Sequence, residues 1–476
     1  MENILKPEAV FKYFKEICAI PHGSGDMEKI SEYCLNFAKE NGLKAICDDA
    51  KNVIIYKNGS KGYENKPPVI LQGHLDMVCQ KTADCHIDFL QDGLELFSDG
   101  DLLGAKGTTL GADNGIAVAM IMAILSDDAI SHPPIEAVFT TDEEIGMLGA
   151  SALDMSLLKG KRMINIDSEE EGVVTVSCAG GSDFSTSIPL TFDVKSGRKY
   201  TLEIKGLKGG HSGVEIDKGG VNADILAGRL LSVLERLTTF DIISINGGDK
   251  CNAIPKSVKV ELLTNDDNFE NVVDVYSEIV RNEISDREKE CVIELETDGE
   301  GEYKVLSEDA KAILIYYLVS TPNGIIDMSV NIEGLVETSL NLGILATEED
   351  RITMKYALRS NKKTALDYLE IRLMIFAESF GLESIISGRY EPWEYREESN
   401  LRDLYVECYE KAFGHKPKVE AIHAGLECSV FASKIEGIDC IAIGPDMTGV
   451  HTAQERLSVS STAKIFGLLL NVLEKM

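Results

Sequence analysis

Apolar residues recur with helical spacing at the start of the chain and then gather into short continuous runs. Helical stripes cover residues 10–18 and 30–38, and Gly42 ends the second. The runs Val53–Tyr56 and Val69–Gln72 follow, and short apolar runs of this kind are typical of buried strands. The chain therefore begins with two amphipathic helices and then enters a sheet.

Strand, loop and helix keep alternating as far as about residue 180. An irregular polar stretch at 80–106 leads to an apolar helix over Ile116–Leu125, and strands are predicted over Ile135–Thr141 and Met163–Ile166. Such alternation predicts an α/β layer whose functional groups lie at the carboxyl ends of the strands.

The pattern changes after Gly180–Gly181, where alternating strands and long amphipathic helices replace the earlier order. The predicted strands are Tyr200–Ile204, Ile242–Ile245, Val258–Leu263, Met328–Ile332, Thr338–Ile344 and Arg351–Leu358. Helices are predicted after Asn222 and over Asn268–Glu283, Lys311–Val319 and Lys363–Phe380. This middle part is predicted to form an α+β layer.

The α/β pattern returns from about Glu391, with a helix over Asp403–Ala412, a strand over Asp439–Ile443 and a closing amphipathic helix. The fold class is therefore α/β with two domains. Residues 1–185 and 389–476 form the first and second parts of one domain, and residues 186–388 form a domain inserted between them.

Composition limits the partners of the protein. In 476 residues, 79 acids stand against 47 bases and give a net charge of -32, which disfavours nucleic acid and anionic membranes because both require a basic surface. The eleven cysteines form no C-x-x-C pair, residues 1–20 show no signal peptide, and no apolar run reaches the roughly 20 residues of a membrane helix. We therefore expect a soluble protein with reduced thiols in the cytoplasm.

The strongest candidate chemistry follows the run Val69–Gln72. His74 and Asp76 are two residues apart, so an extended backbone points both side chains to one side. One of them can bind a metal while the other orients its neighbours. A structural histidine at a strand end is the alternative for this pair taken alone.

Five imidazole or carboxylate groups stand at turns beside apolar elements. They are His74, Asp113, Glu144, Asp167 and His451. Two imidazoles and three carboxylates suit Zn²⁺, Co²⁺ or Mn²⁺ better than Ca²⁺. If Asp113 bridges two ions, each ion receives three protein ligands and a shared water completes the site.

Glu143 is then the carboxylate left to move a proton. Neighbouring side chains point differently, so Glu144 can face the metal while Glu143 faces the water. A solvated acidic turn is the alternative for this pair. Asp167 ends an apolar strand, whereas Glu169–Glu171 are expected to form a solvated charged run.

These motifs resemble the M20 metallopeptidases, and most closely their aminoacyl-histidine (Xaa-His) dipeptidase branch. The similarity extends over nearly the whole chain with the motifs in family order. It rests on Gly73-His-Leu-Asp76, Gly111-Ala-Asp-Asn-Gly115, Thr141-Asp-Glu-Glu-Ile-Gly146, Asn165-Ile-Asp-Ser-Glu169, Gly209-Gly-His-Ser-Gly213, His423-Ala-Gly-Leu-Glu-Cys428 and Gly444-Pro-Asp-Met-Thr-Gly-Val-His451.

The resemblance implies an assignment for the metal ligands. His74, Asp113 and Asp167 would bind one ion, and Asp113, Glu144 and His451 would bind the other. Asp76 would orient His74, and Glu143 would act as general base and then general acid. The family also often has a cis peptide bond after the bridging aspartate, here Asp113–Asn114.

The resemblance also gives a role to the inserted domain, which would be a lid on a zinc-exopeptidase-like catalytic domain. His211 would donate a hydrogen bond to the oxyanion, and Asn252 and Arg359 would hold a substrate carboxylate. Glu427 is a candidate for receiving the substrate α-amine, with an ordinary helix N-terminal carboxylate as the alternative. Ser429 stands where this branch leads us to expect glycine. This difference would alter the wall of the substrate pocket.

Taken together, the sequence predicts a dipeptidase with two divalent ions per subunit, zinc or else cobalt or manganese. Its substrates would be short peptides with free termini, including Xaa-His and β-alanyl-histidine. The alternatives are a related M20 activity, such as that of a tripeptidase, aminoacylase or other amidohydrolase, and a non-enzymatic binding scaffold. A homodimer formed through the lid is also expected, because family members often assemble in this way.

Overall fold

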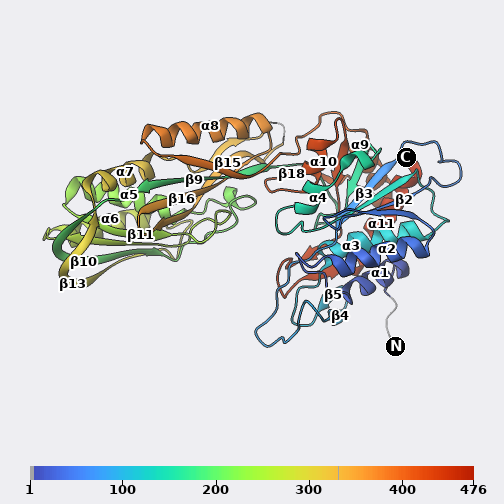
Figure 1. The fold of residues 1–476 in the computed structure, drawn as a ribbon, viewed down its shortest axis with the longest axis horizontal. Helices are drawn as coiled ribbons and strands as arrows, with labels where there is room; N and C mark the ends of the chain where they lie inside the picture. The colour runs from blue at the N-terminus through green and yellow to red at the C-terminus, as the bar shows by residue number, and fades with distance from the viewer. Residues whose placement is uncertain (1–4, 331) are drawn as a thin grey trace. The chain divides into compact units, whose positions relative to one another are not determined.

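The computed structural model describes residues 5–330 and 332–476, and the chain divides into two compact units (Figure 1). Unit 1 contains the residues up to Cys178 together with Tyr395–Ala421 and Leu426–Met476. Unit 2 contains Ala179–Glu394 and Ile422–Gly425. The first boundary follows Cys178 rather than residue 185, because the strand that begins at Gly180 already belongs to the sheet of unit 2.

Unit 1 is built on an eight-stranded sheet in the order β1-β2-β6-β3-β7-β19-β8-β18. Its strands are β1 (Lys44–Cys47), β2 (Val53–Lys57), β3 (Val69–His74), β6 (Ile135–Thr140), β7 (Arg162–Asn165), β8 (Val173–Cys178), β18 (Lys418–Ile422) and β19 (Asp439–Ala442). A second, four-stranded sheet pairs β4 (Leu96–Asp99), β5 (Leu102–Ala105), β20 (Met447–Thr448) and β21 (Arg456–Ser458).

The centre of the large sheet is parallel. Strand β3 pairs in parallel with β6 and β7, and β7 pairs in parallel with β19. Their carboxyl ends therefore lie along one edge, where ligands bind in open α/β sheets.

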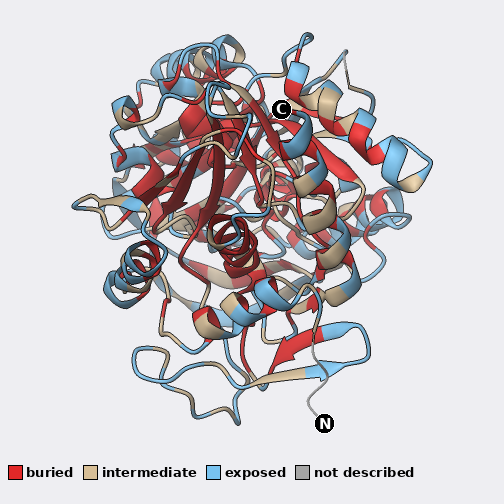
Figure 2. Cartoon of the chain, turned by 90° about the vertical axis from the view of Figure 1, so that its right-hand side faces the viewer, coloured by how far each residue is buried: buried red, intermediate tan, exposed pale blue. Residues whose placement is uncertain are grey.

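Helices enclose this sheet. They are α1 (Glu8–Cys18), α2 (Glu28–Glu40), α3 (Ala112–Ser126), α4 (Leu148–Ala152), α9 (Asn400–Phe413), α10 (Cys428–Lys434) and α11 (Val459–Lys475). Helix α3 is buried from Asn114 to Leu125, between α1 and β3. Figure 2 shows the buried strands in the middle of unit 1 and the exposed outer faces of the surrounding helices.

Unit 2 is an antiparallel sheet in the order β13-β10-β12-β11-β15-β16-β9-β17, with β14 paired to β15. Its strands are β9 (Gly180–Pro189), β10 (Phe192–Lys205), β11 (Asp241–Gly247), β12 (Val258–Thr264), β13 (Val292–Leu306), β14 (Gly324–Met328), β15 (Val336–Thr347), β16 (Arg351–Ser360) and β17 (Ser384–Tyr390). Helices α5 (Ala223–Leu237), α6 (Phe269–Ile284), α7 (Glu308–Ser320) and α8 (Lys363–Ser379) pack on it.

Some predicted elements differ from the structure. The strand predicted over Met328–Ile332 is found at Gly324–Met328, and residue 331 lies outside the described residues. The stretch 80–106 contains β4 and β5 although it was predicted to be irregular. Strand β13 was not predicted, because it lies at a sheet edge and carries mostly exposed acidic and polar residues.

Within the described ranges, no helix combines the length and the apolar character that crossing a bilayer requires.

Gly73 lies inside β3, whose ladder continues to His74. A Cβ atom at Gly73 would lie 2.5 Å from Asn114 Oδ1 and 2.8 Å from Ala117 Cβ. The Asn114 side chain accepts the His74 N–H at 3.2 Å and donates to the Ile166 carbonyl at 2.7 Å. Glycine is therefore required here by the close approach of α3.

We predict that Gly73→Ala lowers the free energy of unfolding by about 1–3 kcal/mol, because the added methyl group overlaps Asn114 and Ala117. Urea denaturation measures this change. Gly467→Ala on α11 is the control, since among the described residues its added Cβ would meet no atom within 4 Å outside its chain neighbours and its own helix backbone, and a neutral or slightly stabilising effect is expected there. Equal losses in the two variants would contradict the packing explanation.

Candidate metal centre

The five predicted metal ligands meet at the carboxyl edge of the unit 1 sheet. His74 ends β3, and Glu144 follows β6 by four residues. Asp167 follows β7 by two residues, Asp113 opens α3, and His451 follows β20. Segments distant in the sequence converge because neighbouring parallel strands end side by side.

The Asp113 carboxylate lies between the two histidines. Its Oδ1 is 3.1 Å from His74 Nε2, and its Oδ2 is 3.0 Å from His451 Nε2. Each carboxylate oxygen thus faces a different imidazole, as expected for an aspartate shared by two ions.

A further carboxylate accompanies each imidazole. Asp167 Oδ1 lies 3.4 Å from His74 Nε2, and Glu144 Oε1 lies 2.9 Å from His451 Nε2. One ligand atom from each of His74, Asp113 and Glu144 falls within 4.8 Å of the others. Imidazole nitrogens and carboxylate oxygens at this spacing fit divalent transition-metal ions.

The charges explain why cations suit this site. Hydrogen bonds that His451 donates to Asp113 and Glu144 raise the pKa of its imidazole to about 11. Burial acts to lower the pKa of His74, but Asp167, Asp113 and Asp76 outweigh it and raise that pKa well above its usual value. Burial raises the pKa of Asp167 to about 6. Metal binding requires neutral imidazoles, so it would release any protons that these two histidines carry.

Asp76 holds both the histidine and the acidic turn. Its Oδ1 is 3.5 Å from His74 Nδ1, and its main-chain carbonyl is 3.0 Å from the same nitrogen. Its carboxylate also accepts the Glu143 N–H at 3.0 Å and the Glu144 N–H at 3.2 Å. Asp76 therefore holds both the imidazole at the end of β3 and the acidic turn that follows β6.

Two residues of this network were missed in the sequence. Ser24 donates its hydroxyl proton to Asp76 Oδ2 at 2.8 Å, and Asn114 links the backbone of His74 to that of Ile166. Asn114 follows Asp113 directly, and the Asp113–Asn114 peptide bond is cis, as the family resemblance implied. Ser24 lies in a Gly-rich loop that gave no signal of its own.

Glu143 is half-buried in the turn after β6. Burial raises the pKa of Glu143 well above its usual value, and nearby Asp167, Glu427 and Glu144 act in the same direction, against the attraction of His74. Of the neighbouring run, Glu169 and Glu170 are exposed, as predicted, whereas Glu171 is half-buried and pairs with Lys464 at 2.9 Å.

Three of the predicted substrate-binding residues lie in unit 2, namely His211, Asn252 and Arg359. His211 Nδ1 accepts the N–H groups of Gly213 and Val214, both at 3.2 Å. Burial lowers the pKa of His211, and nearby Arg359 adds to the effect. The imidazole is therefore neutral with its proton on Nε2, which leaves that atom as a donor.

Asn252 and Arg359 each make a hydrogen bond within unit 2. The exposed Asn252 lies beside the His211 loop, where its carbonyl accepts the Ser212 N–H at 2.9 Å. Arg359, near the end of β16, donates from Nη1 to the Tyr390 hydroxyl at 3.0 Å.

Glu427 is fully buried in unit 1 and immediately precedes α10. Its Oε2 accepts the Thr140 hydroxyl proton at 2.6 Å and a proton from the Gln72 amide. Burial raises the pKa of Glu427 to about 7. A substrate amine would need a rearrangement to reach it. Ser429 is also buried, on the same helix.

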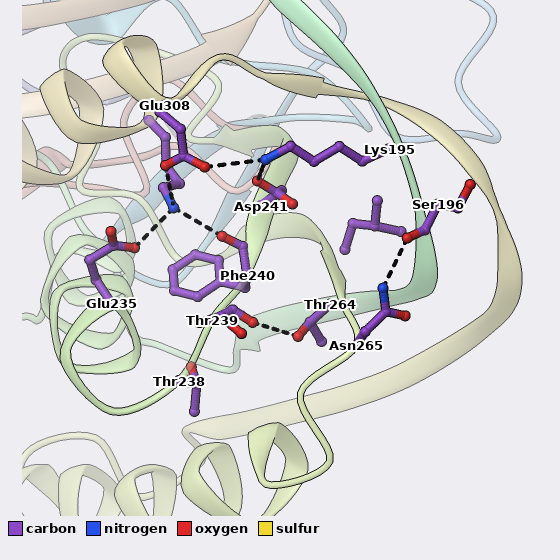
Figure 3. A pocket seen from close by; sticks show the side chains of 12 residues that line it. Lys195, Ser196, Glu235, Thr238, Thr239, Phe240, Asp241, Thr264, Asn265 and Glu308 are labelled. Atoms are coloured by element: carbon purple, nitrogen blue, oxygen red, sulfur yellow. Dashed lines mark hydrogen bonds and ion pairs between the residues drawn. The ribbon is translucent and has the colours of Figure 1, made fainter.

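A polar pocket of about 450 Å³ lies elsewhere, in unit 2 (Figure 3). Lys195 is 2.7 Å from Asp241 and 3.2 Å from Glu308. Lys311 is 3.1 Å from Glu308 and 3.3 Å from Glu235. The lysines that line this pocket are thus paired within it, and it has none of the predicted site residues.

The model of peptidase family M20/M25/M40 matches residues 70–475. The chain belongs to this family. The cytosol non-specific dipeptidase of Escherichia coli (strain K12) is 36% identical to this chain over 476 residues, which cover 99% of this chain and 98% of the relative.

Solved structures agree with this assignment. Aminoacylhistidine dipeptidase from Vibrio alginolyticus superposes with a TM-score of 0.91 at 36% identity, covering 99% of this chain and 97% of that one. A Staphylococcus aureus tripeptidase shares the fold at a TM-score of 0.58 and 15% identity, with 99% of each chain covered. The family and the fold predicted from the sequence are confirmed.

Proposed function

We propose that this protein is a dipeptidase that binds two divalent metal ions through His74, Asp113, Glu144, Asp167 and His451. The observation that carries the proposal is the Asp113 carboxylate, with one oxygen facing each histidine. His74, Asp113 and Asp167 would hold one ion, and Asp113, Glu144 and His451 the other. The mixed nitrogen and oxygen donors favour zinc, with cobalt or manganese as alternatives.

When bound, the ions would supply Lewis acidity, which polarises a peptide carbonyl and lowers the pKa of water. Glu143 takes the proton from the attacking water and gives it to the leaving amine. Its position supports this role, because its backbone is held by Asp76 while its neighbour Glu144 faces His451. The raised pKa of Glu143 also suits a group that accepts and then returns a proton.

Substrate contacts are assigned to four residues. His211 donates from Nε2 to the developing oxyanion, which its fixed tautomer supports. Asn252 and Arg359 hold the substrate carboxylate, and the guanidinium suits a two-pronged contact. Glu427 interacts with the substrate α-amine only if that buried carboxylate becomes accessible.

The substrates would be dipeptides with free termini, including Xaa-His and β-alanyl-histidine. The names of the two 36% identical relatives, a non-specific dipeptidase and an aminoacylhistidine dipeptidase, support this class. A cytoplasmic location is supported by the first of those names and by the eleven free cysteines. A related M20 activity is the second candidate.

We predict that Glu143→Ala keeps its metal but loses roughly 10²–10⁴-fold in kcat, because the proton carrier is removed. Asp113→Ala should lose both ions, since each ion shares that carboxylate. Elemental analysis and peptide hydrolysis of the purified variants measure both effects. The exposed Glu170→Ala serves as control and should keep metal and activity. Full activity in Glu143→Ala would refute its proton-transfer role.

A substrate panel tests the proposed activity. Metal-loaded protein is given Ala-His, β-Ala-His, a tripeptide and an N-acetyl amino acid, and kcat/KM is measured for each. We expect the dipeptides to be hydrolysed with the highest values. A preference for the tripeptide or the N-acetyl compound would instead indicate the related M20 activity.

We also propose a homodimer formed through unit 2. Helix α8 carries an exposed apolar stripe that contains Tyr368, Ile371 and Ile375, with relative exposures of 67%, 52% and 59%. A contiguous apolar face of this kind is typical of an interface.

We predict that the double variant Ile371→Glu and Ile375→Glu is monomeric in sedimentation velocity while the wild-type chain is dimeric, because four glutamates would meet at the interface. Lys411→Glu on α9 makes the same change in net charge at an exposed site and should stay dimeric. A monomeric wild-type chain would disprove the homodimer.

A further inference from the structure

Glu455 binds the backbone that carries the bridging aspartate. Its side chain is buried, with 2% exposure. Its Oε2 accepts the N–H groups of Leu110 at 2.7 Å and Gly111 at 3.1 Å. Its Oε1 accepts those of Ala112 at 2.8 Å and Asp113 at 3.3 Å. One carboxylate therefore satisfies four consecutive backbone donors.

These four donors need an outside partner. The first N–H groups of a helix have no intrahelical acceptor, which applies to Ala112 and Asp113 because α3 begins at Ala112 with no side-chain cap from Gly111. The chain cannot form a regular first turn here, because Asp113 has a ψ of 98° and Gly111 a φ of 67°. A carboxylate is a strong acceptor and matches the positive end of the helix dipole.

The segment that supplies Glu455 also supplies His451. A tight turn connects them, in which the Thr452 N–H bonds to the Gly449 carbonyl and the Glu455 N–H bonds to the Thr452 carbonyl, both at 3.1 Å. His451 has a φ of 62°, unusual for a residue with a side chain. One short segment thus places an imidazole 3.0 Å from Asp113 Oδ2 and grips the Asp113 backbone.

We propose that Glu455 is a positioning residue that fixes the bridging carboxylate relative to His451, so that binding of the metal pair depends on it. The inference rests on the proposed metal centre. It assigns Glu455 no contact with substrate or metal. Glu455 acts on the metal centre through its hydrogen bond to the Asp113 backbone and through the turn that connects it with His451.

The test is Glu455→Gln in the full-length chain. Glutamine has nearly the same size, but its amide has one acceptor oxygen, and its NH₂ group would face backbone donors. We expect circular dichroism to show a folded protein that binds Zn²⁺ about 10–100-fold more weakly in isothermal titration calorimetry. We also expect the Co²⁺ absorption spectrum to change, because the ligands around the shared carboxylate are displaced.

Glu136→Gln is the matched control. Glu136 is also a buried unit 1 carboxylate that accepts backbone protons, from the N–H groups of Lys159 and Gly160, but it lies near the opposite end of β6. We expect this variant to melt at a lower temperature while its Zn²⁺ affinity and Co²⁺ spectrum match the wild type. Glu455→Asp, which keeps the charge but is shorter, should bind metal with intermediate affinity and provides the test if Glu455→Gln does not fold.

Wild-type Zn²⁺ affinity and an unchanged Co²⁺ spectrum in the Glu455 variants would overturn the proposal. Equal losses of affinity in Glu455→Gln and Glu136→Gln would also overturn it, since they would show general destabilisation. Two ions bound by the wild-type chain support the proposed metal centre whatever the variants do. Fewer than two ions in the wild type would overturn both proposals, and this result is read before any variant is compared.

Discussion

The Asp113 carboxylate is the group on which the rest of the site depends. It sits between two imidazoles, and Asp167 and Glu144 complete the cluster. Acidic groups held this close repel one another unless positive charge lies between them. Asp167, Asp113 and Asp76 raise the pKa of His74, and Asp113 and Glu144 raise that of His451, which favours positively charged imidazoles at this site. Two divalent cations would provide more positive charge than these two imidazoles.

The parallel sheet makes this cluster possible. Strands β3, β6 and β7 end beside one another, so residues separated along the chain by tens of positions meet at one edge. Side chains then fix the loops beyond the strands. Asp76 holds the Glu143–Glu144 turn, Asn114 connects β3 with the residue after β7, and Glu455 holds the start of α3. The precision of the site thus comes from hydrogen bonds between loops as well as from the strands.

Unit 2 is organised differently and carries a different kind of group. Its antiparallel strands present loops such as the one around His211, in which backbone N–H groups fix the imidazole tautomer. Loops of this kind can vary in sequence without disturbing the sheet beneath them. The tripeptidase with the same fold at 15% identity illustrates how far sequences diverge on this scaffold.

The sequence by itself determined the α/β and α+β character of the two parts, the family, and the residues that converge at the sheet edge. It could do so because hydrophobic periodicity is local and because each ligand stands beside an apolar run. Only the tertiary structure decided that Gly73 serves a close helix approach, that Glu427 is buried, and that Glu455 binds the backbone of Asp113. These facts depend on contacts between segments as many as 355 positions apart, and no local pattern encodes such a contact.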